Sequence, residues 1–174
     1  MIALYKGVSF TSTVIRAFTW SDYTHASWTN DDDLSEIEAW TKGVVEVPYF
    51  GTNHTPGTSV DFFRPFLSVG EEQGLVEFLR KQIGKRYDFA GALGFATRND
   101  KAQDQDAWFC TELIFAGFVH IRQPLLARIP AHKVYPGLLS YSPKLIHAMT
   151  LQVKERAQDE AITFVERMRS VGSL

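Results

Sequence analysis

The chain has 174 residues, of which 45% are hydrophobic and 22% charged, and its formal net charge is -2. This composition excludes a disordered or collagen-like chain, and without a basic excess broad nucleic-acid binding is disfavoured. The single cysteine excludes an internal disulfide and any metal or iron–sulfur site that needs several cysteines. The length fits one domain over residues 1–174, and we expect about residues 152–174 to form a C-terminal helical appendage.

The N-terminal half is predicted to form one helix and then several strands. Residues 8–20 carry apolar side chains at helical spacing, with Thr11 or Ser12 as the expected N-cap. Three segments rich in β-branched and aromatic residues predict a meander, and a fourth strand follows the Gly/Pro-containing loop 51–57. These strand segments are residues 23–29, 34–40, 44–47 and 58–64.

The C-terminal half is predicted to be mainly helical. Amphipathic patterns predict helices in three places, and a short apolar helix is expected between the first two. Strands followed by helices indicate an α+β fold in which an antiparallel sheet is segregated from the helices. The helices are expected at residues 71–83, 88–95, 109–121 and 154–171, with loops at residues 97–106 and 130–144.

The apolar runs near the N-terminus are short and interrupted by polar residues such as Lys6 and Ser9. They do not form the apolar core of a signal peptide. No stretch approaches the roughly 18 apolar residues of a membrane span. We therefore expect a cytoplasmic protein, or one exported without a classical signal.

The single cysteine, Cys110, falls at the start of the predicted helix 109–121. Backbone N–H groups without helical partners and the helix dipole favour an anion there, which suits a nucleophilic thiolate. Glu112 would oppose the thiolate unless its side chain points to solvent and only complements the dipole. A buried, inert cysteine is the alternative interpretation, because free cysteine is among the most buried residue types.

A nucleophilic thiol needs a base, usually histidine. His25 lies within a predicted strand, where a rigid scaffold could aim it. His54, in a Gly/Pro-rich loop, fits a surface residue, and His120 lies roughly 15 Å from the thiol along the helix, which is too far. Spacing leaves His132 and His147 open.

The base also needs a polar group that orients it, and Glu36, Glu38 and Glu46 are available. Glu38 lies on the strand that should pair with the strand of His25. Cross-strand neighbours approach within about 5 Å between Cβ atoms, close enough for a carboxylate–imidazole contact. A solvent-facing glutamate is the alternative.

Four segments resemble motifs of the circularly permuted NlpC-like, papain-like cysteine hydrolases, in their YiiX-like branch. TWSDYTHASW resembles the T-x-S-x-Y-S-H-x-x-I element, and WFCTELI resembles the W-x-C-S-E-L-V nucleophile motif, with Thr111 in place of the usual serine. LSEIEAWTKGVVEVPY resembles the strands that carry the third catalytic group, and GKRYDFAGALGF resembles the G-x-x-Y-D-F stretch. The resemblance covers roughly residues 1–145, and the histidine strand precedes the cysteine helix.

The resemblance implies a permuted papain-like (NlpC-type) fold, in which an antiparallel sheet or half-barrel packs against helices and the nucleophile begins a helix. It implies Cys110 as nucleophile, His25 as base, Glu38 as the orienting group and Tyr87 in the substrate cleft, with no metal and no cofactor. The implied activity is that of a cysteine amidase or peptidase. Its substrate would be a small molecule or peptide, such as a cell-wall peptide or an N-acyl amino acid.

Three other functions stay open. One is a lipid acyltransferase or thioesterase of the lecithin:retinol acyltransferase type, and another is a non-catalytic structural module, for example in a virion. The third is a metal site of His25, Glu38 and Cys110, although their separations match no metal-binding motif. The sequence sets neither the oligomeric state nor the contacts of the final helix.

Overall fold

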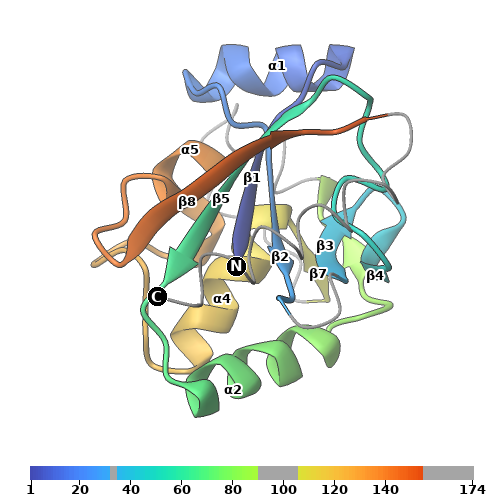
Figure 1. Ribbon diagram of the computed structural model, residues 1–174. Helices are drawn as coiled ribbons and strands as arrows, with labels where there is room; N and C mark the ends of the chain where they lie inside the picture. The colour runs from blue at the N-terminus through green and yellow to red at the C-terminus, as the bar shows by residue number, and fades with distance from the viewer. Residues whose placement is uncertain (32–34, 90–105, 155–174) are drawn as a thin grey trace.

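The fold is α+β, with helices arranged around a six-stranded sheet (Figure 1). The computed structural model describes residues 1–31, 35–89 and 106–154. In the large sheet the strand order is β4-β3-β2-β1-β5-β8, and all neighbouring strands are antiparallel, which confirms the predicted fold class. The strands are β1 (Ile2–Lys6), β2 (His25–Thr29), β3 (Glu36–Trp40), β4 (Gly43–Val47), β5 (Ser59–Pro65), β6 (Arg86–Tyr87), β7 (Ala107–Trp108) and β8 (Leu145–Gln152).

The helices lie at the ends and on one face of the sheet. In Figure 1, α1 crosses above one end of the strands and α2 lies at the opposite end. Helix α4 packs against β2 and β3, and α2 packs against α4. The three longer helices confirm the predictions for residues 8–20, 71–83 and 109–121. They are α1 (Phe10–Thr19), α2 (Val69–Arg80) and α4 (Cys110–His120), followed by the short helices η1 (Ala131–Lys133) and α5 (Pro136–Leu139).

The N-cap of α1 is Ser9 rather than Thr11 or Ser12. Ser9 has extended backbone dihedrals, and its hydroxyl accepts the backbone N–H of Ser12 at 3.2 Å. A cap must sit just outside the first helical residue. Thr11 and Ser12 are already inside the helix, which begins at Phe10, so the sequence-based N-cap was wrong.

On β2 and β3, the two faces of the sheet bury different kinds of side chain. The first face packs in the core that includes the buried face of α4. Its side chains on β1, β2 and β3 are Ile2, Leu4, Ala26, Trp28, Ile37 and Ala39. Because side chains alternate along a strand, the residues between them face the other way. The buried polar residues of β2 and β3 therefore gather on the second face. They are His25, Ser27, Thr29, Glu36 and Glu38.

Two strands of the sheet were not predicted. The central strand β1 is the apolar run IALYK, which is buried from Ile2 to Tyr5 and so lacks the alternation of a half-buried strand. The edge strand β8 pairs with β5. The predicted helix 154–171 beyond Lys154, the loop 97–106 before Asp106 and the predicted helix 88–95 beyond Phe89 lie outside the described residues.

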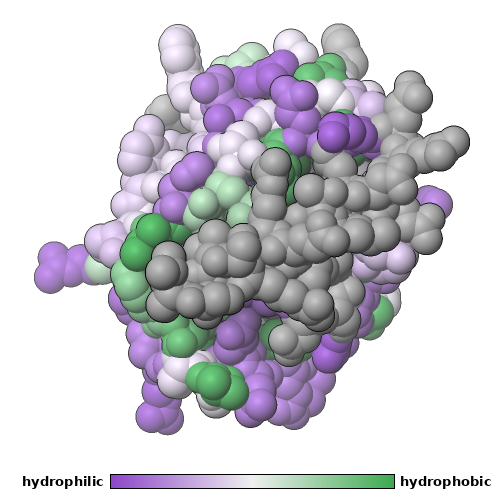
Figure 2. Space-filling view, in the orientation of Figure 1, coloured by the Kyte–Doolittle hydropathy of each residue, from purple (hydrophilic) through white to green (hydrophobic). Residues whose placement is uncertain are grey.

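Within the described ranges, no helix is both long and apolar enough to cross a membrane. Figure 2 shows hydrophilic side chains over much of the described surface in that view, with hydrophobic side chains in separate patches. The large exposed hydrophobic residues come from different elements. Among them are Trp20 at the end of α1, Val69 in α2 and Ile146 in β8.

Substitution of Phe118 tests the packing of α4 on the sheet. Its side chain is fully buried, and its ring lies 6.1 Å from that of Trp28 between centroids. We expect Phe118→Ala to lower the free energy of unfolding by about 3–5 kcal/mol in denaturant titrations, because it leaves a cavity. The matched control is Val119→Ala at the exposed neighbouring position, which should change it by less than about 0.5 kcal/mol. Equal losses in both variants would contradict this packing.

Candidate active site

Cys110 is the first residue of α4 and is 1% exposed. The preceding residue, Phe109, has an extended backbone (φ -84, ψ 154), so the chain turns into the helix at the thiol. Glu112 is buried too, and its carboxylate accepts the backbone N–H of Phe109 at 3.5 Å. The solvent-facing alternative for Glu112 is therefore wrong, since this side chain satisfies a donor at the buried start of the helix.

His25 is held where β2 begins. The backbone N–H of Thr24 donates to the carbonyl of Tyr5 at 2.8 Å, which continues the pairing of β1 with β2. One residue earlier, the Tyr23 hydroxyl donates to the buried carboxylate of Asp61 on β5 at 2.6 Å. The segment leading to His25 is thus tied to two strands, and the imidazole starts from a fixed backbone.

The structure brings Cys110, His25 and Glu38 together. Nε2 of His25 lies 2.7 Å from Oε2 of Glu38, which leaves Nδ1 for the thiol. Burial alone would lower the pKa of His25. The charge and hydrogen bond of Cys110, helped by those of Glu38, outweigh burial and raise this pKa to about 10. In this arrangement the imidazole of His25 therefore holds its proton at neutral pH.

Glu38 is fully buried, yet it is the ionised member of the site. Pairing of Trp28 with Ile37 sets a register in which Glu38 lies opposite Ser27, two residues from His25 on one face. Burial raises the pKa of a carboxyl group. The hydrogen bond and positive charge of His25 outweigh it and hold the pKa of Glu38 well below its usual range.

A second buried carboxyl, Glu36, lies on the same face of β3. Its Oε1 accepts the hydroxyls of Tyr5 and Ser27, and its Oε2 accepts the backbone N–H of Gly51 at 3.0 Å. Burial, together with the negative charge of Glu38, raises the pKa of Glu36 to about 8. The strand thus carries two carboxyls, one ionised and one that holds its proton at neutral pH.

His54 was predicted to be a surface residue, and this is wrong. Its side chain is 5% exposed, and its ring stacks on Tyr5 with 3.7 Å between centroids and 3° between planes. Asn53, which sequence reasoning did not single out, donates from Nδ2 to Oε1 of Glu38 at 2.8 Å. Nothing local in the sequence indicates these contacts, because they depend on the path of the loop across the sheet.

The other predicted alternatives have different partners. Glu46 forms an ion pair with Arg80 at 2.8 Å, and the His120 ring stacks 4.8 Å from Phe78. His147 lies on β8, with Nε2 3.7 Å from the carboxylate of Asp61. Of the three glutamates, Glu38 is therefore the one that the structure places on His25.

Tyr87 lies beside the cysteine. It belongs to β6, which pairs in parallel with β7, and it lies opposite Trp108, two residues before Cys110. Burial raises the pKa of Tyr87 well above its usual value, and the negative charge of Cys110 adds to this. The hydroxyl therefore stays protonated and can donate a hydrogen bond near the sulfur.

His25, Glu38 and His54 also offer three possible metal ligands, whose atoms lie within 4.8 Å of one another. Ligand atoms about 2.0–2.2 Å from a tetrahedral ion are roughly 3.3 Å apart. His25 Nε2 and Glu38 Oε2 are closer, at 2.7 Å, because they share a hydrogen bond. As placed, these atoms do not frame an ion, and we assign no chemical step to one.

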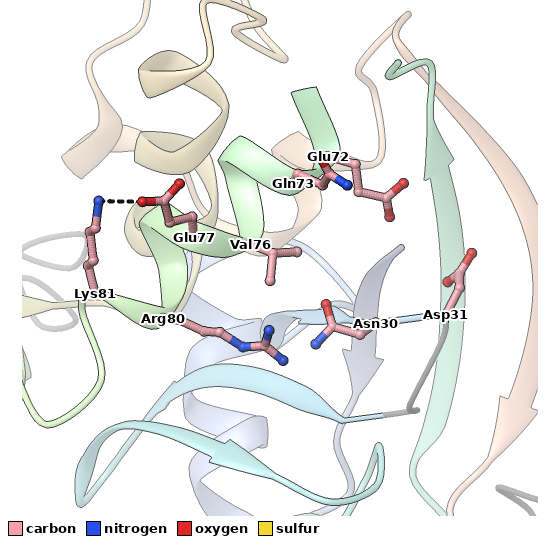
Figure 3. Close-up of a pocket in the computed structure, with 8 residues that line it drawn as sticks. All are labelled: Asn30, Asp31, Glu72, Gln73, Val76, Glu77, Arg80 and Lys81. Atoms are coloured by element: carbon pink, nitrogen blue, oxygen red, sulfur yellow. Dashed lines mark hydrogen bonds and ion pairs between the residues drawn. The ribbon is translucent and has the colours of Figure 1, made fainter. Parts of the chain in front are cut away.

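Two grooves lie near the ends of β2. Figure 3 shows the larger, about 730 Å³, between α2 and the residues that follow Thr29. It carries the Glu77–Lys81 ion pair and lies at the opposite end of β2 from His25. A second groove of about 340 Å³ is next to the segment that leads to His25. Its lining includes Arg16, Trp20, Asp22, Tyr23, Tyr135 and Tyr141.

Comparison with solved structures confirms the predicted fold. The chain superposes on the crystal structure of metalloprotein yiiX from Escherichia coli O157:H7 with a TM-score of 0.63. The match covers 86% of this chain and 95% of that chain, at 17% sequence identity. No family model matches the sequence, and no curated protein matches it significantly. At this identity the comparison establishes the permuted NlpC-type, papain-like fold.

The proton on Glu36 predicts a pH effect on stability. Its ordinary pKa of 4.5 is raised to about 8 in the folded protein, so between these values the folded state binds more protons than the unfolded state. This contribution is complete below about pH 4.5 and is lost as the pH rises towards 8. We expect Glu36→Gln, which cannot titrate, to gain stability relative to wild type between pH 5 and 8.

Urea titrations at several pH values measure this difference. Glu46→Gln, which removes a carboxylate from the outer ion pair with Arg80, is the matched control. Parallel stability curves for wild type and Glu36→Gln across this pH range would contradict a protonated Glu36.

Proposed function

We propose that the protein is a cysteine hydrolase that cleaves an amide bond through Cys110, His25 and Glu38. The observation that carries the proposal is the buried contact of one imidazole with both the Cys110 thiol and the Glu38 carboxylate. The sulfur also begins a helix of 11 residues, where partial positive charge favours an anion. The fold shared with yiiX is the one expected of the cysteine hydrolases that the sequence motifs resemble, and it supports the proposal by fold analogy alone.

In the acylation step, the Cys110 thiolate attacks the carbonyl carbon of the substrate. His25, which holds the former thiol proton on Nδ1, donates it to the leaving nitrogen as the C–N bond breaks. An amine departs, and the acyl group stays on sulfur as a thioester. Glu38 keeps Nε2 of His25 hydrogen-bonded, so the same ring nitrogen faces the reaction throughout.

In the deacylation step, His25 takes a proton from water on Nδ1, and the hydroxide attacks the thioester. The C–S bond then breaks and releases a carboxylic acid, which restores the thiolate–imidazolium pair. In both steps, unpaired backbone N–H groups at the start of α4, including that of Cys110, can stabilise the oxyanion. The Tyr87 hydroxyl, kept protonated by burial, is a further donor at the cleft.

The substrate class is a small amide or peptide. The groove lined by Tyr23 and Tyr135 supports this substrate class, because both residues are close in the chain to residues of the site. Tyr23 is two residues before His25, and Tyr135 follows Val134, whose carbonyl accepts the Thr111 hydroxyl next to Cys110. Aromatic walls with a few charged groups suit an amide with an apolar portion.

Alkylation of the single cysteine tests the proposed ion pair. A free cysteine ionises near pH 8.5, so fast iodoacetamide labelling near pH 6 requires stabilisation of the thiolate. We expect wild type to label rapidly at pH 6, and His25→Ala to lose this rate at pH 6 but label at pH 9. Intact-protein mass spectrometry measures the rates.

Cys110→Ala is the control for labelling outside the cysteine, because the chain has one Cys. Slow labelling of wild type at pH 6, with a rate that rises only above pH 8, would favour the inert, buried cysteine and overturn the proposed function.

Tyr87→Phe separates substrate chemistry from thiolate formation. If the hydroxyl donates to the substrate oxyanion, we expect kcat to fall by about 10²-fold while iodoacetamide labelling at pH 6 stays within about twofold of wild type. Activity is measured by mass spectrometry on muropeptides and N-acyl amino acids, with phospholipids as a comparison substrate. An unchanged kcat would show that the Tyr87 hydroxyl does not stabilise the oxyanion and that this side chain only packs.

A further inference from the structure

The loop between β4 and β5 lies over the two buried glutamates. The backbone N–H of Gly51 donates to Oε2 of Glu36 at 3.0 Å and to the Tyr5 hydroxyl at 3.2 Å. At the other end of the loop, the N–H of Gly57 donates to the carbonyl of Val153 at 2.7 Å. The loop is therefore fixed at both ends to the sheet that carries the catalytic residues.

Gly51 sets the direction of this loop. Its φ is +76°, which side chains other than glycine rarely adopt, and an added Cβ would lie 2.8 Å from a methyl group of Val153. The carbonyl of Gly51 then accepts the backbone N–H of His54 at 2.9 Å. This turn directs Asn53 and His54 towards the sheet.

The two side chains reach Glu38 in different ways. Asn53 donates from Nδ2 to Oε1 at 2.8 Å, while His25 occupies Oε2 at 2.7 Å. His54 lies 3.6 Å from Oε2 through Nε2, which has no hydrogen-bond partner among the described residues. Oε1 of Glu38 thus accepts a hydrogen bond from the Asn53 amide, and Oε2 accepts one from His25 and lies next to the His54 ring.

His54 covers this pair with its ring. It stacks on Tyr5 and meets Trp40 edge-on at 4.7 Å, and Trp40 in turn contacts the ring of His25 at 4.9 Å. Burial lowers the pKa of His54 to about 4, so it is neutral at pH 7 and leaves the charge on His25. The other titratable groups that face the Glu38–His25 pair are Cys110 of α4, Glu36 of β3 and Tyr5 of β1.

We propose that Asn53 and His54 are positioning residues of the cysteine hydrolase, a proposal that rests on the function given above. Asn53 fixes the rotation of the Glu38 carboxylate by its hydrogen bond, and the His54 ring excludes water from the Glu38–His25 contact. Both effects keep Nε2 of His25 bound to Glu38. The proton available to Cys110 and the leaving group then stays on Nδ1.

The test compares iodoacetamide labelling of Cys110 at pH 6 and pH 9. We expect Asn53→Ala and His54→Ala to label about three- to tenfold more slowly than wild type at pH 6, and within about twofold of it at pH 9, where the thiol ionises without help. Asn53→Asp, which keeps the size of the side chain but cannot donate to Oε1 of Glu38, should be about as slow as Asn53→Ala at pH 6. His54→Phe, which keeps a stacking ring, should recover most of the rate lost in His54→Ala.

Thr55→Ala, in the exposed part of the same loop, is the matched control and should label like wild type. Thermal melts identify variants that lose the fold, and Asn53→Asp and His54→Phe provide the comparison if an alanine variant does. A structural role alone would lower the melting temperature without changing the ratio of rates at pH 6 and pH 9.

Three outcomes would overturn the proposal. The first is that all four variants label at pH 6 within twofold of wild type, while wild type labels fast. The second is that His54→Phe stays as slow as His54→Ala. The third is calorimetric binding of Zn²⁺ by wild type that disappears in His54→Phe, which would make His54 a metal ligand. Slow labelling of wild type itself is a different result, since it rejects the proposed function rather than the roles of Asn53 and His54.

Discussion

The structure of the site depends on the hydrogen bond between the buried Glu38 carboxylate and the imidazole of His25. A carboxylate without contact with water is costly unless charged or hydrogen-bonding groups compensate it. Here the donors are His25 at 2.7 Å and Asn53 at 2.8 Å, from a strand and a loop that are far apart in the sequence. The same bond occupies Nε2 of His25, so the contact that offsets the burial of Glu38 also orients the imidazole.

The pKa of the neighbouring carboxyl, Glu36, is raised, whereas that of Glu38 is lowered. Glu36 lies two residues from Glu38 on the same face of β3, where two negative charges would repel each other in a dry environment. Only Glu38 has an imidazole at hydrogen-bond distance, whereas Glu36 has hydroxyls and the N–H of Gly51. Glu36 therefore keeps a proton near neutral pH and anchors the loop, and Glu38 keeps the charge.

The sequence predicted the fold class, the meander β2–β3–β4 and the three longer helices because their patterns are local. The β-branched and aromatic content of residues 23–29 and 34–40 placed His25 and Glu38 on strands that pair, and helical periodicity after residue 109 placed Cys110 at a helix start. The central strand β1 was missed, because burial on both faces removes the alternation that marks a strand. The edge strand β8 was not predicted either.

What the sequence by itself determined is which elements carry Cys110, His25 and Glu38, since the residue types that mark strands and helices are local properties. Only the tertiary structure decided the rest. It buried the side chain of Glu112 at the start of α4. It also buried the side chain of His54 against Tyr5, although the composition of the His54 loop indicates a surface residue. The position of His54 depends on a long-range contact, the hydrogen bond that the backbone N–H of Gly51 donates to Glu36, and no local pattern of residues encodes such a contact.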